Sequence, residues 1–228
     1  MDKNTFILSL GGSLISTKSK IDWSYLKKFL NLILKQTKKG KKFIIITGGG
    51  ATCRNYQKTA GRIAALSHED LDWIGIHTTR FHAQFLKILF GKYAHQDIIT
   101  NPTLKIKTRK KIIIGAGWKP GCSTDQDSVL IAKNQKIKTI INLSNIDYAY
   151  TRDPDKFKDA KKIHAISWTE FRKIVGNKWI PGLNMPFDPI ASRTAQRIGL
   201  QVIITNGKKL ANLNKIFNNQ KFKGTIIS

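Results

Sequence analysis

Acidic residues are scarce in this chain of 228 residues: fourteen Asp and Glu stand against forty Lys and Arg, a formal net charge of +26 at pH 7. Such an excess is compatible with nucleic-acid binding through neutralisation of phosphates. The lysines, however, are dispersed in short KK and KxK pieces, whereas dedicated nucleic-acid binders concentrate their charge. We therefore do not expect nucleic acid as the main partner, although the charge does not exclude it. Small polyanionic substrates would be attracted by the same field.

Cysteines and long hydrophobic runs are also few. Cys53 and Cys122 lie far apart, which indicates neither a disulfide framework nor a zinc site. The five histidines show no metal-ligand spacing, so we name no dedicated metal-ligating residues. No apolar run approaches the roughly 18–20 residues that span a bilayer, and the N-terminal residues lack the pattern of a secretory signal. We expect a reduced, cytoplasmic protein that does not engage a membrane.

What the chain does contain is a series of short apolar runs, several of them followed by glycine or polar residues and then by a helical pattern. Several runs are continuously apolar, which is typical of a parallel sheet covered by helices on both faces. The length suits one α/β domain spanning residues 1–228. The expected strands are 6–10, 42–47, 111–117, 138–143, 201–205 and 224–228, and the expected helices are 24–38, one ending near 65, 72–90 and 125–135.

Two glycine clusters follow the first two expected strands. Ligands of doubly wound sheets bind at the carboxyl ends of the strands. Gly12 and Ser13 can offer backbone N–H groups and a hydroxyl to an anion there. The three glycines at 48–50 allow close backbone approach, and Arg54, one helical turn further on, can reach back with a forked donor set. A plain strand–helix turn is the alternative interpretation of each cluster.

A third loop, GAGWKPGCSTDQD at 115–127, combines a lysine, two hydroxyls and two carboxylates. Ser123 and Thr124 can hold a phosphate or a base edge, or one of them can cap the following helix. Asp125 is either a helix cap or a group that orients a ligand. The loop therefore indicates either a binding site or capping alone.

A fourth cluster follows the expected strand at 138–143. The segment NLSNIDYAYTRDPDK places polar groups at a strand end and then an aromatic ring, Tyr150, which suits ribose and base. The alternative is a turn-rich loop in which the tyrosine packs on its own domain.

Two further aspartates stand beside expected helices. Asp72 precedes the expected helix 72–90, where it could cap that helix or accept a sugar hydroxyl. Asp188 is followed by Pro189, and an aspartate N-cap with proline at the first helical position explains it structurally. A carboxylate at a phosphate-transfer centre could also position donors or magnesium.

The order of these motifs carries a more specific signal than any one of them. The run LGGS, TGGG…R, DWIG…TTR, GWKPGCSTD, NLSNIDYAYTRDP, PFDPIA and GTII resembles the amino-acid kinase superfamily. Within it, the chain is most similar to uridylate (UMP) kinases of the archaeal-like type, from about residue 5 to the end. The resemblance implies a one-domain, three-layer α/β/α fold with a mostly parallel sheet. It also implies transfer of the ATP γ-phosphoryl group to UMP, giving UDP, with magnesium and a homo-oligomer, commonly a ring-like hexamer.

The same resemblance assigns expected roles to matching positions, which fall into three sets. The ATP side would comprise Gly12, Ser13, Gly50, Arg54, Ser144, Tyr150 and Asp153. The UMP side would comprise Gly49, Asp72, Trp118, Lys119, Pro120, Gly121, Cys122, Ser123 and Thr124. Arg54, Lys119 and Asp188 would form the catalytic set.

The chain departs from the family's pattern at two expected cations. Many members carry lysine where this chain has Ser9, and relatives often carry lysine where it has Ala51. We hypothesise that Lys119 and Arg54 offset the phosphate charge instead, with Arg193 as a further available cation. Two alternatives stay open: a sibling kinase acting on another small acid or phosphate, and a non-catalytic nucleotide- or RNA-binding protein.

Overall fold

The computed structural model describes residues 4–17, 20–154, 156–178 and 185–228. Its main element is a seven-stranded sheet in the order β3-β2-β1-β4-β8-β9-β7. The first five strands of this order are mutually parallel, whereas β9 runs antiparallel to β8. The strands are β1 (Thr5–Leu10), β2 (Lys42–Thr47), β3 (Ile112–Gly115), β4 (Thr139–Ser144), β7 (Ala165–Ile166), β8 (Gln201–Asn206) and β9 (Thr225–Ile227); β5 (Ala149–Tyr150) and β6 (Lys162–Ile163) form a separate antiparallel pair.

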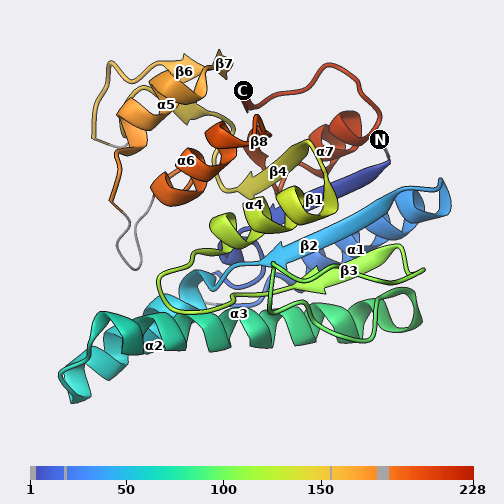
Figure 1. The fold of residues 1–228 in the computed structure, drawn as a ribbon, viewed down its shortest axis with the longest axis horizontal. Helices are drawn as coiled ribbons and strands as arrows, with labels where there is room; N and C mark the ends of the chain where they lie inside the picture. The colour runs from blue at the N-terminus through green and yellow to red at the C-terminus, as the bar shows by residue number, and fades with distance from the viewer. Residues whose placement is uncertain (1–3, 18–19, 155, 179–184) are drawn as a thin grey trace.

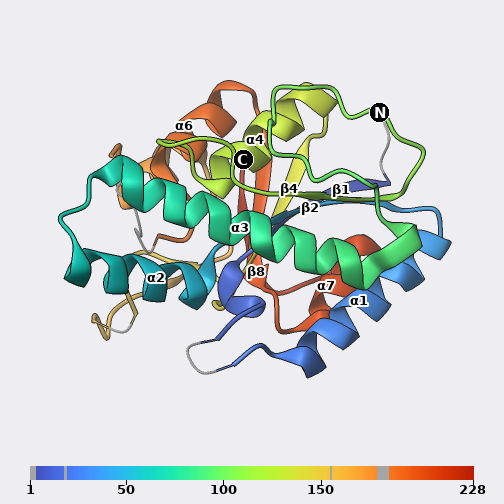
Figure 2. The same cartoon turned by 90° about the horizontal axis from the view of Figure 1, so that it is seen from below.

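Helices cover both faces of this sheet (Figures 1 and 2). One core cluster joins α1 and α3 and the later α7 to Leu8, Phe43 and Ile45 of the strands. A second cluster joins α4, α5 and α6 to the opposite face. The helices are α1 (Trp23–Lys38), α2 (Gly50–Ile63), α3 (His68–Phe90), α4 (Thr124–Gln135), α5 (Trp168–Val175), α6 (Pro189–Arg197) and α7 (Leu210–Phe217), with short 3₁₀ turns η1 (Gly12–Leu14) and η2 (Gly91–Tyr93). The expected three-layer α/β/α arrangement is confirmed.

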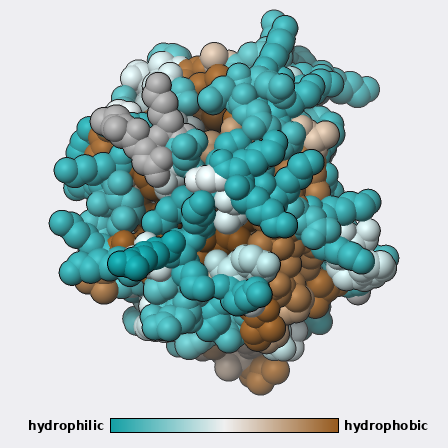
Figure 3. Space-filling model, turned by 90° about the vertical axis from the view of Figure 1, so that its right-hand side faces the viewer, coloured by the Kyte–Doolittle hydropathy of each residue, from teal (hydrophilic) through white to brown (hydrophobic). Residues whose placement is uncertain are grey.

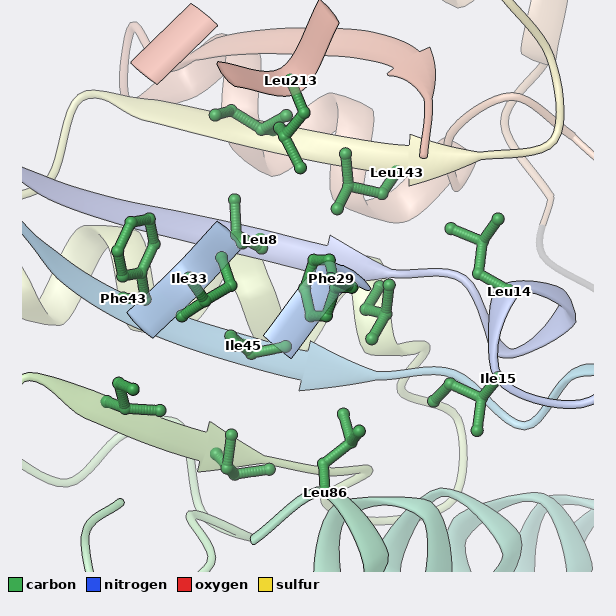
Figure 4. Packing of buried hydrophobic residues seen from close by; sticks show 14 of the residues in the cluster. Leu8, Leu14, Ile15, Phe29, Ile33, Phe43, Ile45, Leu86, Leu143 and Leu213 are labelled. Atoms are coloured by element: carbon green, nitrogen blue, oxygen red, sulfur yellow. The ribbon is translucent and has the colours of Figure 1, made fainter. Parts of the chain in front are cut away.

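The two faces of β1 and β2 divide their side chains between these cores. Leu8, Phe43 and Ile45 point toward α1, whose Phe29 and Ile33 are fully buried against them (Figure 4). Side chains of this size each contribute roughly 1.5–3 kcal/mol when removed from water. Because both faces are packed, the strands read as continuous apolar runs, as the sequence indicated.

One expected helix boundary was wrong. The helix predicted from residue 72 begins at His68, and Ser67 is its N-cap. Ser67 Oγ accepts the N–H of Asp70 at 3.1 Å, while Asp70 Oδ2 accepts the N–H of Ser67 at 2.9 Å. This reciprocal capping box satisfies the N-terminal donors, so Asp72 lies inside the first turns of α3 and does not cap it.

Parallel pairing brings the carboxyl ends of β1, β2, β3, β4 and β8 to one edge of the sheet (left in Figure 1). The amino ends lie at the opposite edge, which faces the viewer in Figure 3 as a mostly hydrophilic surface with hydrophobic hollows. A hollow of about 670 Å³ at that edge is lined by residues from the strand starts, including Thr5, Lys42 and Thr139. It is therefore remote from the glycine clusters. None of the described helices is both long and apolar enough to cross a membrane.

Candidate active site

The loops after β1 and β2 interlock through glycine backbone. A Cβ built on Gly12 would lie 2.2 Å from the nitrogen of Gly50, and one on Gly50 would lie 2.3 Å from the carbonyl carbon of Gly12. Gly50 also has a φ of +62°, a conformation that side chains rarely adopt. The two clusters predicted separately from the sequence therefore form one contiguous structure, in which each glycine makes room for the other.

The start of α2 has the features of a helix end that can bind an anion. Gly49 is the N-cap of α2 and has no side-chain hydrogen bond to the helix among the described residues, and the first turn contains no acidic residue. Uncapped N–H groups and the helix dipole favour a phosphate there. Arg54 lies exposed on the second turn of the same helix, next to Cys53. Burial raises the pKa of the Cys53 thiol, and the positive charge of Arg54 opposes part of this rise.

The predicted UMP loop is tied to α3 by Asp72. Asp72 Oδ2 accepts the N–H of Gly121 at 2.7 Å. Gly49 is close as well, because a Cβ built on it would lie 2.6 Å from the Cβ of Cys53 and 3.9 Å from the carbonyl oxygen of Gly75, three residues beyond Asp72. The structure thus brings together Gly49, Asp72 and the 118–124 loop, which the sequence placed in separate motifs.

Arg80 fixes the base of the same loop, a role that sequence reasoning did not assign. Its Nη2 donates to the carbonyl oxygen of Trp118 at 2.9 Å and its Nε to that of Gly117 at 3.3 Å. Thr79 Oγ1 accepts the N–H of Gly117 at 2.9 Å. The TTR triplet was the available signal, but only the packing of α3 beneath the loop shows what it holds.

Lys119 packs on its neighbour within the loop. Its Nζ lies 4.3 Å from the centroid of the Trp118 ring, a cation–π contact. The lysine is exposed, and the indole is partly buried. Trp118 therefore positions a cation that is otherwise free to reach solvent.

Four side chains meet behind the glycine loops at the carboxyl ends of β1 and β4. Ser9 Oγ donates to Asp125 Oδ1 at 3.0 Å, and Asn142 Nδ2 lies 3.4 Å from the same oxygen. The backbone N–H of Asp188 donates to Asp125 Oδ2 at 3.2 Å. Ser123 is the N-cap of α4, its Oγ accepting from Gln126, so Asp125 does not cap that helix but holds β1 and α6 together. Asp188 is the N-cap of α6, with Pro189 at its start as expected.

A third carboxylate, Asp127, is buried beside this group. Its Oδ2 accepts the N–H of Trp118 at 3.2 Å, and its Oδ1 accepts from Cys122 Sγ at 3.2 Å. Burial raises the pKa of Asp127 to about 7, and the thiol of Cys122 and the N–H of Trp118 oppose the rise. The pKa of Cys122 is raised strongly by burial and by Asp127, so its thiol stays protonated.

Burial also raises the pKa of Asp125 to about 7, with a further contribution from the Asp188 carboxylate and opposition from Ser9. The pKa of Asp188 is raised by burial, and the N–H of Ala191 and the nearby hydroxyl of Ser123 oppose this. The carboxylates behind the loops are therefore harder to ionise than ordinary aspartates.

We expect this group to make the protein less stable as the pH rises. An unfolded aspartate titrates near 3.9, so between about pH 4 and pH 7 the folded state holds protons at Asp125 and Asp127 that the unfolded state has lost. The free energy of unfolding should fall across this window, by at most about 1.4 kcal/mol per pH unit for each group, and level off above it. Urea unfolding from pH 5 to 8 in the presence of EDTA measures it.

The variant Asp125→Asn isolates this contribution, because it removes the titration while keeping an acceptor for Ser9. Its free energy of unfolding should fall less steeply with pH than that of the natural protein. The exposed Asp159→Asn serves as the matched control and should leave the slope unchanged. Parallel profiles for the natural protein and Asp125→Asn would contradict the assigned pKa.

The predicted ATP-side residues separate into two groups. Gly12, Ser13 and Gly50 belong to the interlocked loops, and Ser144 adjoins them, since a Cβ on Gly11 would lie 3.9 Å from its Cα. Tyr150 lies in β5 opposite Lys162, and exposed Asp153 follows with its Oδ2 3.7 Å from Lys156 Nζ. The structure places these last two on the β5–β6 hairpin beyond β4, and their contact with a nucleotide stays a prediction.

The donor set behind the loops fits magnesium. The Oδ2 atom of Asp188 is shielded from solvent and has no hydrogen-bond partner among the described residues. Mg²⁺ prefers such oxygen ligands and commonly binds through one or two carboxylates together with substrate phosphates. Within the described parts of the chain, no group of three or more His, Cys, Asp and Glu side chains could hold a metal, so this would be a two-carboxylate site.

These features together define a class: a mostly parallel α/β protein whose strand ends carry interlocked glycine loops, an uncapped helix start and a group of buried carboxylates. Residues 4–206 match the model of the amino acid kinase family. The chain belongs to this family.

Individual relatives extend the similarity over almost the whole chain. A uridylate kinase from Staphylothermus marinus is 32% identical over 226 residues, covering 98% of each chain. One from Methanospirillum hungatei is 28% identical over 227 residues, covering 98% of this chain and 94% of the relative. The crystal structure of uridylate kinase from Archaeoglobus fulgidus superposes with a TM-score of 0.83 at 25% identity, covering 99% of this chain and all of that one.

Proposed function

We propose that this chain transfers the γ-phosphoryl group of ATP to UMP, giving ADP and UDP. The observation that carries the proposal is the similarity to uridylate kinases along both chains, at up to 32% identity in the relatives described. The site supports it independently, because a second loop, tied to α3 by Asp72, lies beside the anion-binding loops. Two adjoining polar sites suit a reaction that transfers a phosphoryl group from one nucleotide to another.

Such a reaction needs little covalent work from the protein. It needs a donor phosphate and an acceptor phosphate held in line, with their negative charge offset. In this chain the N–H groups of η1 and α2 would hold the ATP phosphates, and the 118–124 loop with Asp72 would hold UMP. Arg54 and Lys119 would supply side-chain cations. Magnesium bound with ATP would supply further charge offset at the β- and γ-phosphates.

The placement of Asp72 refines its expected role. In the structure its Oδ2 accepts from Gly121, which leaves the carboxylate's remaining lone pairs for a ribose hydroxyl. It would therefore bind the sugar and hold the loop at the same time. Asp188 acts differently: it lies with Asp125 behind the loops, where it would position a cation and not touch UMP.

We also propose a homo-oligomer working in the cytoplasm. Three large apolar side chains on α3 support self-association: Phe81, Ile88 and Leu89 are 66%, 64% and 42% exposed. Apolar groups along one long helix commonly mark an interface. The hexamer expected from the resemblance is one assembly that such a helix could build.

The substrate assignment is tested by an acceptor screen. ADP production, measured in a coupled assay with ATP and Mg²⁺, should be fastest with UMP and at least about tenfold slower with CMP and dUMP at equal concentration, because the polar 118–124 loop and Asp72 would be left with unpaired groups. Comparable rates with all three would contradict the assignment to UMP. Turnover only with a small acid or another phosphate would identify a sibling kinase. The net charge of +26 motivates a second alternative: salt-sensitive RNA binding without turnover would identify a non-catalytic protein.

A further inference from the structure

Two carboxylates that are shielded from solvent, those of Asp125 and Asp188, lie next to each other. Asp125 and Asp188 are joined by the N–H of Asp188, which donates to Asp125 Oδ2 at 3.2 Å. Asp188 is 7% exposed, and Asp125 is partly buried. In a protein of net charge +26, none of the described lysines or arginines forms an ion pair with either carboxylate.

The side chains that contact Asp125 directly are polar and uncharged. Ser9 and Asn142 are direct neighbours in the β1–β4 register, and both side chains face Asp125. Asp127, two residues along α4, is a third acidic side chain near the pair. Arg80 interacts electrostatically with Asp127 while it donates to the carbonyl oxygens of Gly117 and Trp118.

One oxygen of the pair is left without a partner. Asp188 Oδ1 accepts the N–H of Ala191 at 2.6 Å, but Oδ2 is shielded from solvent and has no hydrogen-bond partner among the described residues. Leaving a buried charged acceptor unsatisfied has a desolvation cost. A metal ion bound at this oxygen would remove this cost.

We propose that Asp125 and Asp188 bind a divalent cation of the Mg²⁺ class directly, before any nucleotide is present. Carboxylate oxygens from the first turn of α4 and the start of α6 would be the protein ligands, with the Ser9 hydroxyl as a neutral oxygen beside them. Two carboxylates leave open coordination positions, which water or phosphate oxygens fill. The inference rests on the proposed function in one respect only: that function identifies the phosphates as those of ATP.

The position of this site explains how the chain can lack a basic residue at Ser9. The cation would sit beside Ser9, which contacts Asp125 and lies two residues before Gly11 at the end of β1. A metal ion held there would offset the negative charge of the phosphates, as the ammonium group of a lysine at the position of Ser9 could.

Binding of Mn²⁺ to the nucleotide-free protein tests the site, followed by electron paramagnetic resonance of the free ion at pH 7.5. We expect about one tightly bound Mn²⁺ per chain, which excess Mg²⁺ displaces. Asp188→Asn and Asp125→Asn should each weaken binding at least tenfold, while the exposed Asp159→Asn should not change it. Asn retains the helix cap at 188, and circular dichroism reports whether each variant is folded.

One further variant keeps the test decisive. Ser9→Lys, which brings an ammonium to the pair and keeps both carboxylates, should abolish Mn²⁺ binding. Absence of Mn²⁺ uptake by the natural protein, or equal uptake by Asp188→Asn, would overturn the proposal.

The outcome is separable from that of the proposed function. If Mn²⁺ binds as described but no UDP forms, the cation site stands and the kinase assignment fails. If UDP forms while the nucleotide-free protein binds no Mn²⁺, the kinase assignment stands and this site is rejected.

Discussion

Gly50→Ala should lower UDP formation at least about a hundredfold. The new methyl group would meet the carbonyl carbon of Gly12 at 2.3 Å and its oxygen at 2.4 Å, and the residue would be held at a φ of +62°. Backbone atoms cannot rotate away as a flexible side chain can, so the two loops must separate and their N–H groups lose alignment with the phosphates. Overpacking of this kind also destabilises by roughly 1–3 kcal/mol or more. Steady-state kinetics and thermal unfolding measure the two effects.

Two glycines provide matched controls for this variant. Gly199, after α6, has a similar positive φ of +58°, but a Cβ there meets nothing within 4 Å, so Gly199→Ala reports backbone strain alone. Gly61 lies inside α2 with open space around it, and Gly61→Ala should stabilise the protein by up to about 1 kcal/mol. If Gly50→Ala retains kcat within a few-fold of the natural protein while folded, the loops do not act as a pair.

Arg54→Ala should reduce kcat by about 10²–10³-fold. The arginine stands on the second turn of the helix whose uncapped start is proposed to hold phosphate, and removal of one donor aimed at developing charge costs a factor of this order. Because the residue is exposed, stability should change by less than about 0.5 kcal/mol. Arg62→Ala, two turns further along α2, is the control and should leave kcat unchanged.

Lys119→Ala extends the same test to the other proposed cation. Loss of the ammonium that packs on Trp118 should raise KM for UMP and lower kcat. The fall in kcat should be smaller than that of Arg54→Ala if the phosphate loops carry most of the charge offset. Near-unchanged kcat in both variants would refute the hypothesis that these two side chains replace the lysines expected at Ser9 and Ala51.

The sheet was predictable because its signals are local. β2, β3 and β8 contain short runs of continuous apolar residues, and burial on both faces requires that pattern. The short helices α5 and α7 were not predicted, since eight residues span barely two turns and carry little periodicity. The start of α3 was placed four residues late, although Ser67 and Asp70 carry the capping-box pattern.

The site was predictable only as a set of separate motifs. That Gly12 and Gly50 touch, and that Asp72 holds Gly121, follows from the pairing of strands and helices far apart in sequence. The contact between Ser9 and Asp125 joins residues 116 positions apart, so no local pattern could indicate it. The sequence showed that the cation expected at Ser9 is missing, but only the structure shows that Ser9 donates to Asp125, which also accepts from the backbone of Asp188.

The central claim is tested most directly by identifying the products formed from ATP and UMP in the presence of Mg²⁺. Phosphorus NMR of the reaction mixture should show UDP and ADP appearing in equal amounts with the natural protein, and almost none with folded Gly50→Ala. Hydrolysis of ATP without UDP, or no consumption of ATP by the folded natural protein, would contradict the account.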